Sequence, residues 1–186
     1  MKKLIAALLM VGVTARLAPA AAQEEGVNKS VYFAAPDKTS DIIEYPDSDG
    51  CLLRMGYENS FLSLAYNAKT KIAIVRFVSK EATSIKNDEK KKLNIMFLVT
   101  PTREGDTWED TDFTAKINED GSRYFTSEPL NSEFIDSFAK SVTVAFFYGE
   151  NLVESFNLAG SAKLVSKLKD CSMMAGGINP NDPFTK

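Results

Sequence analysis

The chain has 186 residues, enough for one domain with a buried core, and 44% of them are hydrophobic. Its 25 acidic residues outnumber its 22 basic ones, which gives a formal net charge of −3 at pH 7. This balance disfavours nucleic acid as a partner, because phosphates attract a basic surface, and it equally disfavours adsorption to anionic lipid.

The first 22 residues predict a secretory signal peptide. Lys2 and Lys3 form a positive start, residues 4–13 are an almost unbroken apolar run, and residues 20–22 are small enough for cleavage after Ala22. The apolar run is too short for an anchor, and no later segment reaches the ~18 apolar residues of a membrane helix. We expect a periplasmic or secreted mature protein, not attached to the membrane, with 19 basic and 25 acidic residues and a net charge of −6. An amphipathic surface helix is the alternative interpretation.

Alternating and continuous apolar segments predict a single, mainly β (α+β) domain over residues 23–172. The expected strands cover residues 31–34, 42–45, 51–57, 62–66, 72–78, 93–99, 113–117, 123–126, 142–148 and 152–158. Short polar turns separate the third, fourth and fifth of these strands. We therefore expect an antiparallel β-sandwich or meander with two short helices packed on it.

Two segments change to helical periodicity. In residues 129–140 the apolar side chains fall on one face, and Asn131 or Ser132 is placed to cap the helix. In residues 161–171 the apolar residues again share a face, and Ser161 is the expected N-cap.

Two polar segments are predicted to lie outside the core. Residues 87–92, NDEKKK, are a charge run that we interpret as solvated surface, with a partner-binding patch as the alternative. Residues 173–186 contain two Gly, two Pro and two Asn, which predicts a flexible C-terminal tail.

The chain contains two cysteines, Cys51 and Cys171. An even pair in an exported chain predicts a disulfide, which would tie the final helix to the first half of the domain. The chain-entropy formula gives roughly 5 kcal/mol for a loop of this size. Two thiols are the alternative, and a reactive thiol would need a base or cation nearby, such as Lys167 or Lys169.

The segment leading to Cys171 has the form F-x-L-x-G-S-x-x-x-L-x-x-L. Its defining residues are Phe156, Leu158, Gly160, Ser161, Leu164 and Leu168. It resembles the C-terminal signature of the invasion-associated locus B family of exported bacterial proteins. The resemblance implies a β-rich exported fold and a role at the cell envelope or in host contact, and it transfers no catalytic residue.

No chemical motif stands out in the sequence. The absence of histidine excludes Ser-His-Asp and Cys-His catalysis, and no Gly-rich phosphate-binding motif is present. Asp47 and Asp49 match the start of a calcium loop, but the residues that should complete it are missing, so a turn is expected there. We predict a non-enzymatic protein with no cofactor and no metal site. A hydrolase that uses a carboxylate pair is the alternative.

Residues 102–112 form the longest polar stretch, which we expect to be a loop and therefore the first place for binding. Its candidate binding residues are Trp108 and the acids Glu104, Asp106, Glu109, Asp110 and Asp112. Trp108 is either an exposed anchor for a partner or a strand-end residue that covers the core edge. The acids could also bind calcium.

These expectations combine into a functional hypothesis. The protein is predicted to bind an unidentified protein partner in the periplasm or cell envelope. An inhibitor or immunity-type protein against a periplasmic enzyme is the alternative, since an acidic surface suits a basic target.

Overall fold

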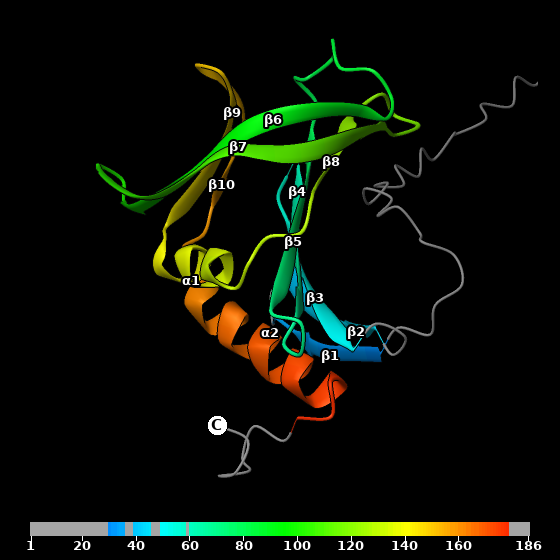
Figure 1. Ribbon diagram of the computed structural model, residues 1–186, viewed down its shortest axis with the longest axis vertical. Coiled ribbons are helices and arrows are strands. Elements are labelled where there is room, and N and C mark those ends of the chain that lie inside the picture. Colours follow the sequence, from blue (N-terminus) through cyan, green and yellow to red (C-terminus); the bar gives the residue numbers. More distant parts are fainter. Residues whose placement is uncertain (1–29, 36–38, 46–48, 59, 179–186) are drawn as a thin grey trace, which may run out of the picture.

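Ten strands and two helices make up the part of the chain described by this computed structural model, residues 30–35, 39–45, 49–58 and 60–178 (Figure 1). The strands are β1 (Ser30–Ala34), β2 (Ser40–Tyr45), β3 (Gly50–Gly56), β4 (Phe61–Asn67), β5 (Ile72–Ser79), β6 (Glu89–Thr100), β7 (Arg103–Ile117), β8 (Arg123–Ser127), β9 (Thr143–Tyr148) and β10 (Asn151–Asn157). The helices are α1 (Glu133–Lys140) and α2 (Ser161–Ala175). The predicted signal peptide, Asp47 and residues 179–186 lie outside the described ranges.

All ten strands belong to one antiparallel sheet, in the order β1-β2-β3-β4-β5-β8-β7-β6-β9-β10. The first five strands are neighbours both in sequence and in space, so the predicted meander is confirmed. The predicted mainly β fold with two packed helices is confirmed as well.

A cluster of phenylalanines shows how strongly the sheet curls. The ring of Phe77 in β5 stacks on Phe125 at 4.7 Å and on Phe146 at 4.1 Å, and it meets Phe113 and Phe156 edge-on. These partners come from β8, β9, β7 and β10, which include the far edge of the sheet. Strands on either side of β6 and β7 therefore enclose one aromatic core.

The edge strand β10 is reached by side chains from the other half of the sheet. Ser79 Oγ donates a hydrogen bond to the Val153 carbonyl at 3.1 Å, and the Tyr57 hydroxyl donates to the Asn157 carbonyl at 2.6 Å. Burial raises the pKa of Tyr57 to about 12, so this hydroxyl keeps its proton. These bonds occupy edge carbonyls that would otherwise be open to another strand.

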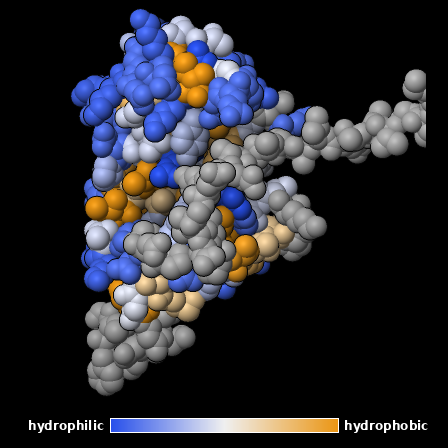
Figure 2. Space-filling model, turned by 90° about the vertical axis from the view of Figure 1, so that its right-hand side faces the viewer, coloured by the Kyte–Doolittle hydropathy of each residue, from blue (hydrophilic) through white to orange (hydrophobic). Residues whose placement is uncertain are grey.

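One end of the curled sheet is covered by the polar connection between β5 and β6. Ile85 is buried there, and the Arg123 guanidinium donates to the main-chain carbonyls of Ile85 and Thr83 at 2.8 and 2.6 Å. This end lies at the upper right of Figure 1, and the corresponding upper part of Figure 2 is mostly hydrophilic. The polar side chains of this connection are therefore mostly exposed to solvent, whereas the apolar side chain of Ile85 is buried.

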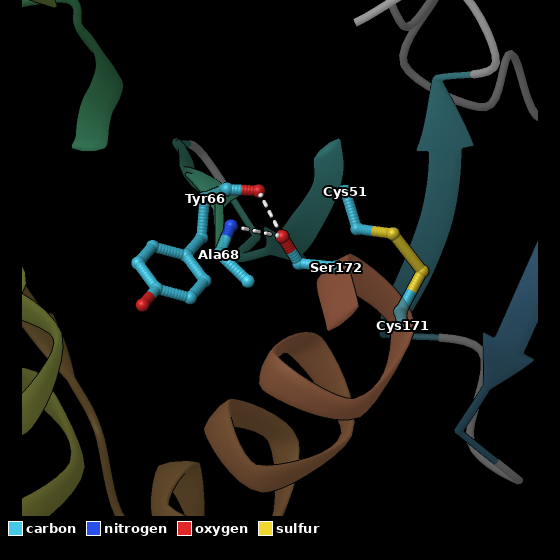
Figure 3. The surroundings of a disulfide bond; sticks show 5 residues. All are labelled: Cys51, Tyr66, Ala68, Cys171 and Ser172. Carbon is cyan, nitrogen blue, oxygen red and sulfur yellow. Dashed lines mark hydrogen bonds between the residues drawn. A yellow bond between two sulfur atoms is a disulfide. The ribbon is translucent and has the colours of Figure 1, made fainter. Parts of the chain in front are cut away.

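The two helices pack against each other, and α2 also packs on β2, β3 and β4 (Figure 1). The predicted disulfide between Cys51 in β3 and Cys171 in α2 is present, with both residues buried. Beside it, Ser172 Oγ accepts a hydrogen bond from Ala68 N and donates one to the Tyr66 carbonyl, at 2.7 and 2.9 Å (Figure 3). No helix among the described residues is long and apolar enough to cross a membrane.

The ends of the helices differ in part from the sequence-based expectation. Asn131 Oδ1 caps α1 by accepting a hydrogen bond from Glu133 N at 2.9 Å. Asn131 was one of the two residues expected to cap this helix. Ser161 does not cap α2. It is the first helical residue, follows a left-handed Gly160, and donates instead to the Phe138 carbonyl of α1 at 3.1 Å.

Helix α2 also extends beyond the expected boundary. Residues 173–175, assigned to a flexible tail from the sequence, continue the helix to Ala175. The helix closes in a Schellman motif, in which Ile178 N donates to the Met173 carbonyl at 2.7 Å and Gly177 N to the Met174 carbonyl at 3.0 Å. Gly177 has the positive φ that this motif requires. Gly176 and Gly177 therefore end α2 later than the composition of residues 173–186 had indicated.

Candidate functional site

The prediction that residues 102–112 form a loop is wrong. From Arg103 onward they belong to β7, which pairs with β6 from Arg103–Thr100 to Ala115–Glu89. The charge run 87–92 is mostly exposed, as expected, but it is not all loop, because β6 begins at Glu89. Both segments lack the apolar alternation by which strands are recognised in a sequence. Pairing with the apolar part of β6 brings β7 into the sheet.

A β-bulge in β7 decides where Trp108 points. Thr111 pairs with Leu93 and Trp108 with Ile95, so Glu109 and Asp110 lie opposite Asn94 alone. Asp110 has a φ of 50°, and its N–H donates to Asn94 Oδ1 at 3.0 Å. A bulge of this kind shifts the alternation by one residue. It therefore turns Trp108 to the face that carries the buried odd-numbered residues further along β7.

Trp108 is half-buried at the edge of the aromatic core. Its ring meets the buried Phe134 of α1 edge-on at 5.4 Å, and Phe134 in turn meets Phe97 of β6 at 5.3 Å. Of the two roles expected for Trp108, this packing matches a residue that covers the core edge, although Trp108 lies within β7 and not at a strand end. The same side chain also lines the cleft described next.

A cleft of about 370 Å³ lies between β7 and α1. It is lined by Asp106, Thr107, Trp108, Glu133, Asp136, Ser137 and Lys140. Three carboxylates and one ammonium group therefore surround an aromatic ring. The cleft joins two segments that are about 30 residues apart in the chain.

Two of the cleft's carboxylates are held by other side chains. Asp106 accepts a hydrogen bond from the buried Ser137 hydroxyl, which also lies within reach of the Glu133 carbonyl. Asp136 forms an ion pair with Lys169 of α2 at 2.7 Å. Glu133 and Lys140 are exposed, and their charged ends form no ion pair with another described residue.

Comparison with known proteins finds no matching family model, no matching curated protein and no matching solved structure.

Only two of the six predicted binding residues, Asp106 and Trp108, line the cleft. The other four, Glu104, Glu109, Asp110 and Asp112, are exposed along β7. Across the described ranges, no three acidic or cysteine side chains converge closely enough to hold a metal ion.

The residues that α1 contributes to the cleft were not predicted. Glu133, Asp136, Ser137 and Lys140 lie on the polar side of a helix whose apolar face was recognised. The exposure of Glu133, Asp136 and Lys140 could have been inferred from that periodicity, whereas Ser137 is buried. Their position beside β7 could not, because it depends on how α1 packs against a distant part of the sheet.

Proposed function

We propose that this protein is an exported, non-enzymatic binding module that contacts a protein partner in the periplasm or cell envelope through the cleft between β7 and α1. The observation that carries the proposal is the cleft itself, where the Trp108 ring is held by Phe134 next to three carboxylates. A fixed aromatic side chain surrounded by charged groups is typical of a protein contact site.

The proposed location rests on the sequence and on the disulfide. The first 22 residues have the composition of a signal peptide. The Cys51–Cys171 disulfide is typical of proteins that fold in an oxidising compartment. The resemblance of the segment 156–171 to the invasion-associated locus B signature supports a role at the envelope or in host contact.

The state of the polar groups in the cleft supports binding over catalysis. Ser137 is buried and hydrogen-bonded to Asp106, and Asp136 is paired with Lys169. The sequence contains no histidine that could serve as a base at this cleft. The groups present can hold a partner, whereas the hydroxyl that lies beside a carboxylate, that of Ser137, is buried and therefore poorly placed to act as a nucleophile.

Affinity capture from periplasmic extract tests the proposal. The wild-type protein should retain a partner that is lost with Trp108→Ala and also with Glu133→Lys, which changes only an exposed side chain. The matched control is Leu152→Ser in β10, where another exposed apolar residue is replaced. Retention of the same proteins by all four would show that the cleft is not the contact surface.

A further inference from the structure

One edge of β7 has no strand partner over residues 103–111. The opposite edge is paired with β6 from Arg103 to Ala115, with three register shifts, whereas β8 pairs with β7 only from Phe113 to Ile117. The last link on the β8 side is the hydrogen bond from Glu128 N to the Asp112 carbonyl, at 2.8 Å. In the described part of the chain, no strand continues along this edge.

The sequence explains why β8 stops there. Pro129 follows Glu128 and has no N–H to donate. Leu130 then leaves β7 and bridges to Ala73 of β5 through two hydrogen bonds of 2.8 Å. The chain continues into α1, which lies below the arm formed by β6 and β7 in Figure 1.

The cleft lies beside this unpaired edge, between β7 and α1. Residues 106–108 of β7 form one wall, and Glu133, Asp136, Ser137 and Lys140 of α1 form the other. A groove between an edge strand and a helix is the arrangement in which extended peptides bind by adding a strand to a sheet. Main-chain hydrogen bonds then supply affinity, and side chains of the groove supply selectivity.

The charge of the groove determines which peptide it suits. Asp106, Glu133 and Asp136 outnumber Lys140 inside the cleft even though Lys169 pairs with Asp136, and Glu104 and Glu109 are exposed beside it. We infer that the β7 edge binds an extended, basic segment of a partner protein as an added strand. Lysine or arginine side chains of that segment meet the acidic walls and the Trp108 ring.

A second copy of this chain is a poorer occupant of the same edge. Pairing two β7 edges would bring like charges together across the new ladder, which is destabilising. The acidic residues and the bulge are also devices that discourage indiscriminate edge pairing. They thereby favour a basic segment over other strands.

This inference rests on the proposed function, and synthetic peptides test it directly. The probe is a fluorescent nine-residue peptide of alternating lysine and valine, which matches the nine residues of the edge. One comparison peptide carries N-methyl groups on alternate amides, and another replaces lysine by glutamate. The wild-type protein should bind the probe, and both changes should weaken binding at least about tenfold, because they remove main-chain hydrogen bonds or reverse the charge.

Charge variants test whether the lysine peptide binds in the groove. Glu104→Gln/Glu133→Gln should weaken binding of the lysine peptide by roughly two- to fivefold per charge, with a smaller effect at high salt. The matched control, Glu119→Gln/Glu150→Gln, removes two exposed carboxylates elsewhere and should bind as the wild type does.

The outcomes separate this inference from the proposed function. Equal binding of the N-methylated peptide would overturn strand addition. Capture of a partner that depends on Trp108, without binding of the lysine peptide, would overturn the inference and leave the proposed function intact. Self-association of the wild-type protein that becomes stronger in the Glu104/Glu133 variant, in which two β7 edges repel each other less, would identify a second copy as the occupant and also overturn it.

Discussion

Ser172 joins the C-terminal helix to the turn between β4 and β5 through the hydrogen bonds to Ala68 and Tyr66. Ser172 is completely buried and its two partners are partly buried, so its removal leaves a donor and an acceptor with little access to water. We expect Ser172→Ala to lower the free energy of unfolding by about 1–3 kcal/mol, measured by urea denaturation. Ser166→Ala, on the exposed side of the same helix, should change it by no more than about 0.5 kcal/mol. Equal stability of both variants would contradict this role.

Asp110 adopts the left-handed backbone conformation that the bulge in β7 needs. Aspartate tolerates this conformation, glycine adopts it without strain, and a β-branched residue does not. We expect Asp110→Val to destabilise the protein by about 1–2 kcal/mol and Asp110→Gly to be nearly neutral. Thermal unfolding followed by Trp108 fluorescence measures both changes. Equal loss from both substitutions would show that the conformation of residue 110 is not what matters.

Glu154 is a partly buried carboxyl group whose environment predicts a pH dependence of stability. Burial raises the pKa of its carboxyl, the charge of Glu81 adds to the rise, and a hydrogen bond from Ser155 N opposes it. A raised folded-state pKa means that stability from this group is present below the unfolded pKa and is lost as the pH rises through the folded pKa. Glu154→Gln should therefore stabilise the protein relative to wild type more at pH 7 than at pH 4. A difference that stays constant with pH, in urea titrations at both values, would refute this.

At the scale of elements, prediction from sequence succeeded where one face of a segment is apolar. Three strands and their meander were identified in this way, from the alternating residues of β3 and β4 and the apolar run of β5. Alternation of apolar and polar residues indicates one buried face, and a continuous apolar run indicates two. The outer part of β7 has no such pattern, because nearly all of its side chains are exposed. It pairs with β6 on one edge and borders the cleft. This segment is a strand because it pairs with β6, and such pairing cannot be predicted from the residues of the segment alone.

The attachment of α1 to the β6–β7 arm depends on a few aromatic contacts. Trp108 and Phe97 both meet the ring of Phe134 edge-on. Because Trp108 is only half-buried, we expect Trp108→Ala to cost about 2–3 kcal/mol, less than the 3–5 kcal/mol of a fully buried Trp. Phe134→Ala, at a fully buried position, should cost more. Chemical denaturation followed by far-ultraviolet circular dichroism tests the order, and the reverse order would contradict this account of the packing.

At the scale of the whole molecule, the sheet is held in its curled form from two sides. The Phe77 cluster joins β5 to strands across the curl, and Ser79 and Tyr57 reach the edge strand β10. The composition indicated an aromatic β-rich interior, but the curl itself follows from contacts between strands that are distant in sequence. The cleft also depends on contacts between distant segments, because α1 meets β7 through the rings of Phe134 and Trp108.

The Cys51–Cys171 disulfide fastens α2 to β3 across 120 positions of the chain, so it connects the first strands with the last element. Cross-linking of so long a loop restricts the unfolded chain, and loss of a native disulfide typically costs about 2–5 kcal/mol. We expect Cys51→Ala/Cys171→Ala to lose stability in this range in urea denaturation, and wild type unfolded under reducing conditions to behave similarly. Because the helix α2 also holds α1 through Ser161 and Lys169, the variant should bind partners at the cleft more weakly as well. Unchanged stability together with unchanged binding would show that packing alone keeps α2 in place.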